Sequence, residues 1–150
     1  MGGIMKTQKC RQRLYKYAYL VALIIALAFV GIGYYLGSIN RIIEDKATLV
    51  TIGTTFAGFL FTGQGIILTL SPTNGFLVAA KKYGYIKDFH RFCRNAEVSF
   101  LSATVFSLKI FQSIVFDLIF LLLFSYALIF AIWSLVLFGQ IVHYYNESVQ

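Results

Sequence analysis

The segment from Leu118 to Asn146 contains no Asp, Glu, Lys or Arg and reads LIFLLLFSYALIFAIWSLVLFGQIVHYYN. A helix needs about 20 consecutive apolar residues to cross the roughly 30 Å of hydrocarbon in a bilayer. This segment exceeds that length, and its apolar residues occupy every side of a helix rather than one stripe. The sequence therefore predicts an integral membrane protein.

Two further segments are long and apolar enough to cross a bilayer, and they are assigned to residues 17–37 and 48–70. The first follows a basic leader that is also typical of a signal peptide, but its apolar run continues well past Ala26-Leu27-Ala28, which favours an uncleaved anchor. The polar link 38–46 between them is expected outside the cell. Pro72 and the Asn74-Gly75 pair predict a turn after the second segment.

The number of spans depends on residues 98–116. Val98–Leu108 is too short to cross alone, but including Lys109 makes the segment long enough if that lysine snorkels to the outer interface. Asp117 then marks the outer turn before a last span at 118–143. In the alternative topology, 98–116 stays outside the hydrocarbon, which leaves three spans and an external C-terminus.

Basic residues are concentrated in two clusters, which hold 10 of the 13 lysines and arginines and account for most of the net charge of +7. Such clusters are expected on cytoplasmic flanks. This placement favours four spans in a bacterial inner membrane, with both termini on the cytoplasmic side. It also argues against direct binding of nucleic acid. The clusters are Lys6, Lys9, Arg11, Arg13 and Lys16, and Lys81, Lys82, Lys87, Arg91 and Arg94.

The predicted architecture is an all-α, polytopic bundle that forms one transmembrane domain over residues 1–150. Its cytoplasmic basic segment, 72–97, is interpreted either as an amphipathic helix in the headgroup boundary or as a solvated connecting helix that continues into the next span. In both cases the exposed cations provide a binding surface for an acidic protein or for anionic lipid. The candidate binding residues are Lys81, Lys82, Lys87, Arg91 and Arg94.

Small, weakly polar residues recur along one side of the second span. Such residues allow helix backbones to approach closely, so this side is predicted to pack within the chain or, alternatively, to form a contact between copies or a conducting path. Gly33 and Gly37 form a similar pair in the first span. Self-association into a homo-oligomer is expected. The second-span residues are Thr51, Thr55, Gly58, Thr62, Gly65 and Thr69.

Three polar residues stand out within or beside the apolar segments. Gln64 is predicted to bond to a neighbouring helix, because a buried amide is costly without a partner, and a polar pore is the alternative. Lys109 and Asp117 mark the outer boundary, where they either pair or extend to the headgroups. No nucleophile elbow, phosphate-binding loop, HExxH or CxxC motif occurs, so neither an enzyme nor a metal or cofactor site is predicted.

The stretch from Thr55 to Ser71, TFAGFLFTGQGIILTLS, precedes a segment that contains Lys81-Lys82-Tyr83-Gly84-Tyr85. This arrangement resembles the membrane components of bacterial antiviral defence systems, such as the four-span membrane subunit of the Kiwa system and the short membrane effectors of retron and cyclic-nucleotide systems. The resemblance covers about Thr51 to Arg94. It implies a small oligomeric inner-membrane protein and transfers no binding residue.

Three functions are consistent with these features. The favoured one is a sensor or scaffold of a defence system that couples a membrane event to a cytosolic effector through the basic segment. The alternatives are a gated pore or membrane-disrupting effector, and a small transporter or flippase. The last is disfavoured because no carboxylate lies deep in the first, second or fourth span.

Overall fold

The computed structural model describes residues 2–37, 43–69, 78, 81, 84–108 and 113–147, with side chains only between 17 and 142. Four long helices make up nearly all of these residues, and no strand occurs among them, so the all-α prediction is confirmed. They are α1 (Gly2–Tyr35), α3 (Lys46–Thr69), α5 (Tyr85–Phe106) and α6 (Ile114–Glu147). Segments long and apolar enough to cross a membrane lie at Tyr17–Tyr35, Lys46–Thr69 and Ile114–Val142.

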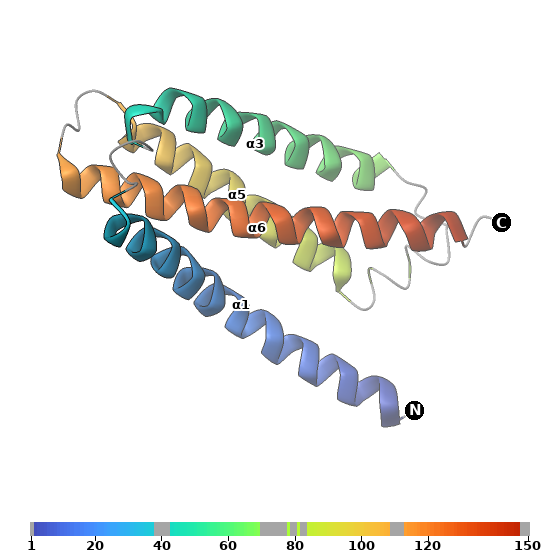
Figure 1. The fold of residues 1–150 in the computed structure, drawn as a ribbon. Coiled ribbons are helices and arrows are strands. Elements are labelled where there is room, and N and C mark those ends of the chain that lie inside the picture. Colours follow the sequence, from blue (N-terminus) through green and yellow to red (C-terminus); the bar gives the residue numbers. More distant parts are fainter. Residues whose placement is uncertain are drawn as a thin grey trace.

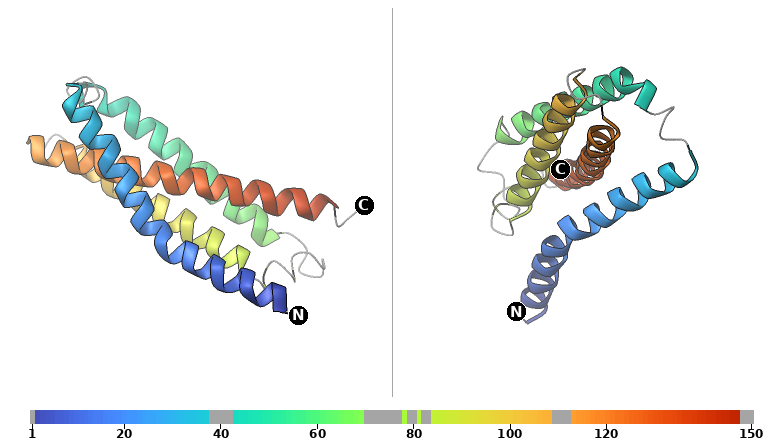
Figure 2. Two further views of the ribbon diagram at one scale, coloured as in Figure 1. Left: turned by 60° about the horizontal axis from the view of Figure 1, so that its bottom comes forward. Right: turned by 90° about the vertical axis from the view of Figure 1, so that its left-hand side faces the viewer.

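Helices α5 and α6 lie side by side, α3 packs on both of them, and α1 packs mainly on α6 (Figures 1 and 2). Consecutive helices run in opposite directions. The starts of α1 and α5 and the ends of α3 and α6 therefore lie at one end of the bundle, called the basic end here because both cation clusters belong to it. The other end, called the far end, holds the ends of α1 and α5 and the starts of α3 and α6.

Aromatic contacts join α5 to α6 along almost the whole length of α5. Phe89 stacks on Phe138 with ring centroids 6.0 Å apart, and Phe92 lies 5.4 Å from Phe130. Nearer the far end, the centroids of Phe100 and Phe124 are 5.6 Å apart. Since each such pair adds about 0.5–1.5 kcal/mol to area burial, this ladder is the main packing element of the bundle.

Helix α1 approaches α6 through alanines at every fourth position. Ala18 is 8% exposed, and Ala22 and Ala26 are fully buried. Alanine leaves the backbone close to the helix surface, which lets two membrane helices come near each other. In contrast, the large side chains on the other sides of α1 are exposed, which is expected where lipid is the solvent.

Two glycines with positive φ set helix boundaries. Gly37, at φ 65°, follows α1, and its amide donates to the carbonyl of Tyr34 at 3.1 Å. Gly84, at φ 80°, precedes α5, and its carbonyl accepts from the amide of Asp88 at 3.0 Å. Glycine adopts a positive φ without steric cost, and a glycine such as Gly37 directly after a helix is a common way for a helix to end. The sequence suggested that Gly37 forms a packing pair with Gly33. In the structure Gly37 instead ends α1.

One interpretation of segment 72–97, a connecting helix that continues into the next segment, agrees with the structure, whereas the predicted span 98–116 extends beyond the end of α5 and into α6. A single helix, α5, joins the end of the first to the start of the second, and it stops at Phe106 where the Ser107 amide bonds back to the carbonyls of Ala103 and Thr104. The next helix begins only at Ile114. The apolar side of the basic segment also packs into the protein through Phe89, rather than into a headgroup layer.

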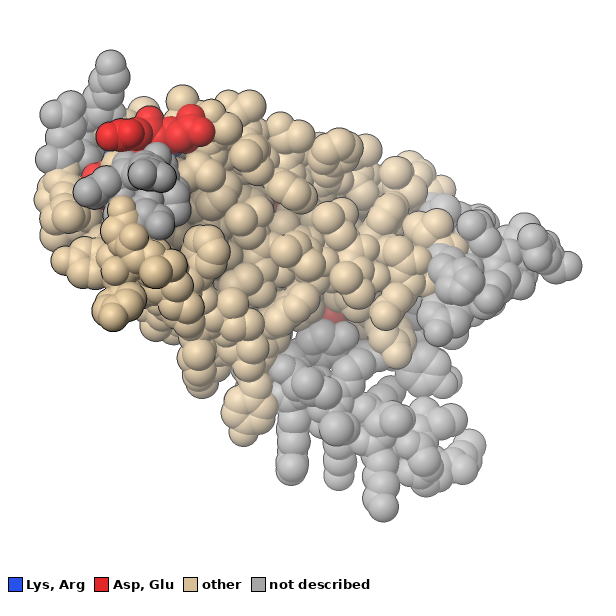
Figure 3. All heavy atoms as spheres, in the orientation of Figure 1, with Lys and Arg blue, Asp and Glu red and all other residues tan. Residues whose placement is uncertain are grey.

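Most of the described flank of the bundle is uncharged. In Figure 3 tan side chains cover most of the described part of the visible face, and most of the visible acidic atoms lie at the far end, where Glu44 and Asp45 are exposed. Large apolar side chains such as Phe61 and Leu68, each 74% exposed, cover the sides of the helices. A continuous apolar belt of this kind indicates contact with lipid rather than with water.

Candidate functional site

Gln64 joins α3 to α5 through both ends of its amide. Its Nε2 donates to Oε1 of Glu97 at 2.7 Å, and its Oε1 lies 3.2 Å from Nδ1 of His90. With the amide in this orientation its oxygen accepts, so the His90 Nδ1 carries the hydrogen. The prediction that Gln64 bonds to a neighbouring helix is confirmed. The three side chains form one polar network between two otherwise apolar helices.

An open pocket of about 660 Å³ lies beside this network. Gln64 lines it from α3, and one side of α5 supplies the rest of its polar lining, because the residues fall at helical spacing of three and four. Three cations and one carboxylate therefore face the same space. The α5 residues are Lys87, His90, Arg91, Arg94 and Glu97.

Burial alters the ionisation of two pocket residues, which lie outside the three candidate spans. The pKa of His90 is below its usual 6.5, because burial disfavours the charged ring. The pKa of Glu97 is raised for the same physical reason. Together with the fixed charges of Lys87, Arg91 and Arg94, this leaves the pocket positive and suited to an anion.

Helix α1 holds the other side of the cationic face of α5. The guanidinium carbon of Arg91 lies 5.0 Å from the centroid of the Tyr19 ring, within the range of a cation–π contact. The Tyr19 hydroxyl accepts a hydrogen bond from Nδ2 of Asn95 at 2.9 Å. These two contacts fix the orientation of the Arg91 side chain, and Arg91 nevertheless stays exposed.

The predicted binding cations are mostly brought together on α5. Lys87, Arg91 and Arg94 are exposed and line the pocket, and Lys81 is exposed just before that helix. Lys82 lies outside the described residues. At the end of α5 nearer the chain termini, the structure thus has a cationic surface on a rigid helix.

The small-residue side of α3 is exposed, so it does not pack within the chain as the sequence predicted. The residues that α3 buries lie on the opposite side of the helix: Gly53, Leu60, Gly63 and Ile67. Added Cβ atoms at Gly58 and Gly65 would meet nothing within 4 Å. The exposed set is Thr51, Thr55, Gly58, Thr62, Gly65 and Thr69.

The threonine hydroxyls on this exposed side are already satisfied by their own helix. Thr55 Oγ1 donates to the carbonyl of Thr51 at 2.8 Å, and Thr62 Oγ1 donates to the carbonyl of Gly58 at 2.9 Å. A hydroxyl bonded in this way needs no water. The surface is therefore suited to lipid or to another helix.

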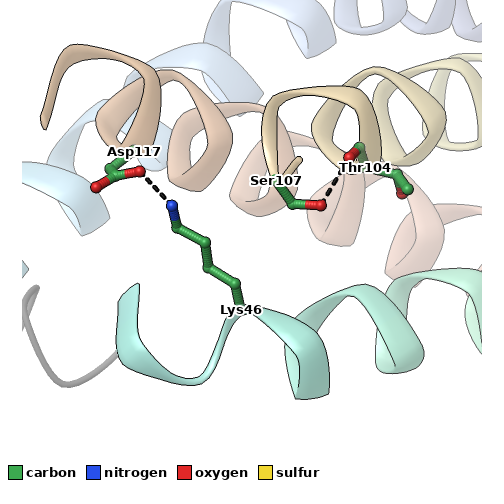
Figure 4. Close-up of polar contacts among 4 residues, drawn as sticks. All are labelled: Lys46, Thr104, Ser107 and Asp117. Carbon is green, nitrogen blue, oxygen red and sulfur yellow. Dashed lines mark hydrogen bonds and ion pairs between the residues drawn. The ribbon is translucent and has the colours of Figure 1, made fainter. Parts of the chain in front are cut away.

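At the far end, Asp117 on α6 forms an ion pair with Lys46 at the start of α3 (Figure 4). The side chains are only 16% and 21% exposed, respectively. Figure 4 also shows the Ser107 hydroxyl donating to the carbonyl of Thr104, at 2.6 Å, where α5 ends. The predicted partner Lys109 lies outside the described residues.

His90 and Glu97 belong to the site but were not predicted from the sequence. They were assigned to a cytoplasmic segment and not to a helix that packs beside Gln64. Their spacing from Arg94, four before and three after, was the available signal, because it places all three on one side of a helix. The need of Gln64 for a partner was the second signal.

Among the residues that the structure describes, no group of three or more His, Cys, Asp or Glu side chains is arranged to hold a metal ion. The chain matches no protein-family model, and comparison with curated proteins and with solved structures finds no match either. The pocket, the cationic surface and the apolar belt are therefore the features that bear on function.

Proposed function

We propose that this protein is an inner-membrane sensor or scaffold whose cationic surface couples a membrane event to a cytosolic partner. The observation that carries the proposal is the exposure of Lys81 and Lys87 at the start of a helix that is packed along the central membrane helix. Complementary charge gives specificity and fast association. An acidic protein surface is the partner that this charge pattern fits.

The proposal includes four membrane crossings. Its support is that α5 contacts α6 from Phe138 to Phe116, which is most of the candidate span Ile114–Val142. A helix packed along that span lies at the same depth in the bilayer. The alternation of helix direction then places both termini and the basic end on the cytoplasmic side, in agreement with the positive-inside rule.

The uncharged part of α5, from Val98 onward, spans only about half of a 30 Å hydrocarbon layer. The backbone of α5 near Arg94 is therefore proposed to lie within the inner leaflet, and the arginine and lysine side chains extend from it to the headgroup level and toward water. This position presents the cations both to the membrane surface and to the cytosol. The antiviral role, which rests on the resemblance of residues 51–94, is part of the same proposal.

Pull-down of cytosolic proteins by the tagged protein in membranes tests this function. Replacing Lys81, Lys82 and Lys87 by Glu is expected to abolish capture of the acidic partner. The matched control replaces Lys6, Lys9 and Arg11 by Glu, which changes the net charge equally on the other cluster. Unchanged capture by the first variant, with both variants inserted in the membrane, contradicts the proposal.

A gated pore is the second candidate, and the exposed side of α3 is the observation that favours it. Several copies that meet through Thr55, Gly58 and Thr62 would form a multi-helix assembly. The proposed homo-oligomer is common to both functions. A pore predicts loss of membrane potential on activation, relieved by Gly58→Leu, whereas a scaffold acts with the potential intact.

A further inference from the structure

One exposed stripe of α5 changes character halfway along the helix. Its residues follow the spacing four, three, four, three, four, so all of them lie on one side. The first three are the pocket cations, and the last three are apolar and 52–63% exposed. The stripe consists of Lys87, Arg91, Arg94, Val98, Leu101 and Val105.

We propose that this stripe and the pocket beside it form a binding site for one anionic glycerophospholipid of the inner leaflet. The lipid phosphate lies on Arg91 and Arg94, and one acyl chain runs along Val98, Leu101 and Val105. The cations of the stripe match the phosphate headgroup of such a lipid, and the apolar residues that follow them match its acyl chain.

The dimensions of the site fit this ligand. A volume of about 660 Å³ is within the roughly 300–1,000 Å³ that is usual for small-molecule sites. From Arg94 to Val105 the helix rises about 16 Å, close to half of a 30 Å hydrocarbon layer. A headgroup at Arg94 thus places its acyl chain within one leaflet.

The pocket is also prepared for a phosphate. Arginine presents two parallel donors to a phosphate, and Arg91 is held in place by the Tyr19 ring. The one carboxylate in the pocket, Glu97, is bonded to Gln64, which holds it on the α3 side of the space.

This inference rests on the membrane orientation of the proposed function but not on the cytosolic partner. A lipid phosphate on Arg91 and Arg94 leaves Lys81, Lys82 and Lys87 for protein docking, so the two activities use different residues. The lipid test below needs no partner, and the pull-down test above leaves both arginines unchanged. A negative lipid-binding test is therefore distinguishable from a negative pull-down test.

Native mass spectrometry of the full chain in detergent tests the site. The protein is titrated with phosphatidylglycerol or with phosphatidylcholine of the same acyl chains. We expect one phosphatidylglycerol to be retained per chain in preference to phosphatidylcholine. The Arg91→Gln/Arg94→Gln variant is expected to bind at least about tenfold more weakly, since a hydrogen bond to a charged group contributes about 1.5–3 kcal/mol.

Two further variants separate the site from general surface charge. Lys9→Gln/Arg13→Gln removes the same charge elsewhere and is expected to keep the lipid. Leu101→Gln, at an exposed position that leaves the core intact, is expected to weaken phosphatidylglycerol binding while the helical circular dichroism is unchanged. Equal weakening by the Lys9→Gln/Arg13→Gln control overturns the inference.

The source of the phosphate is tested by competition with soluble glycerol 1-phosphate. A lipid site requires the acyl chain, so the soluble compound is expected to displace the lipid only at far higher concentration. Displacement at equal concentration, or equal retention of the zwitterionic lipid, would refute a phospholipid site.

Discussion

At the scale of single residues, Gln64 and Gly53 determine how α3 sits on the bundle. Gln64 satisfies the half-buried Glu97 and His90 on α5, and Gly53 allows α3 to approach the rings of Phe100 and Phe124. The first contact was foreseeable, because an amide in an apolar helix requires a partner. The importance of Gly53 could not be foreseen from the sequence, because its sequence context resembles that of the exposed Gly58.

Removal of the Gln64 amide is expected to destabilise the bundle. Gln64→Leu leaves Glu97 without its donor, which costs about 1–3 kcal/mol in the free energy of unfolding. Unfolding by SDS titration in micelles measures this value. Thr62→Val, two residues away and exposed, is the control and is expected to change it by less than about 0.5 kcal/mol.

A double-mutant cycle with Glu97→Leu completes this test. Because Gln64→Leu/Glu97→Leu removes both partners, its destabilisation is expected to be well below the sum of the single variants. Simple additivity would show that the two side chains do not interact.

Glycine replacements on the two sides of α3 are expected to have opposite effects. In Gly53→Ala the new Cβ would lie 2.9 Å from Cδ1 of Phe100 and 3.2 Å from Cε2 of Phe124, so a loss of about 1–3 kcal/mol is expected. Gly58→Ala meets nothing within 4 Å and is expected to be neutral or to stabilise by up to about 1 kcal/mol. Thermal unfolding of both variants gives the comparison, and an equal loss at Gly58 would contradict the assigned orientation of α3.

At the scale of elements, the helices themselves were predictable and their boundaries less so. Uncharged runs longer than the bilayer identified α1, α3 and α6, because length and apolarity are sufficient signals. The cationic half and the apolar half of α5 carry different patterns, so the sequence left open whether the basic segment lies in the headgroup boundary or continues as a helix into the next span. Only the packing of α5 along α6 shows that the two halves form one element.

The exposed small-residue side of α3 predicts a contact between copies. Thr62→Cys, in a Cys10→Ser background, is expected to form cross-linked dimers with a short bifunctional maleimide in membranes. Phe61→Cys lies at the same depth but about 100° around the helix, and it serves as the control. The native Cys93 is fully buried, and burial raises the pKa of its thiol to about 11, so it stays unreactive. Equal cross-linking at both positions would indicate random collision instead.

At the scale of the whole molecule, charge and helix direction agree. Both cation clusters belong to one end of the bundle, while Glu44, Asp45 and the Lys46–Asp117 pair lie at the other (Figures 1 and 3). The distribution of lysines and arginines along the chain is sufficient to predict this separation. The distribution of charge leaves the third crossing open, because the uncharged run after Glu97 is short, and the proposed crossing rests on the packing of α5 along α6.

The central claim is that α5 crosses the bilayer beside α6, which puts the α5–α6 link outside the cell. Labelling of Ser113→Cys in intact cells with a membrane-impermeant maleimide tests this claim directly, in the same Cys10→Ser background. Glu44→Cys is the external reference, and Lys81→Cys is the cytoplasmic one. We expect Ser113→Cys to be labelled from outside like Glu44→Cys. Labelling only after permeabilisation, as for Lys81→Cys, would contradict the four-crossing topology and the positions assigned to the pocket and its cations.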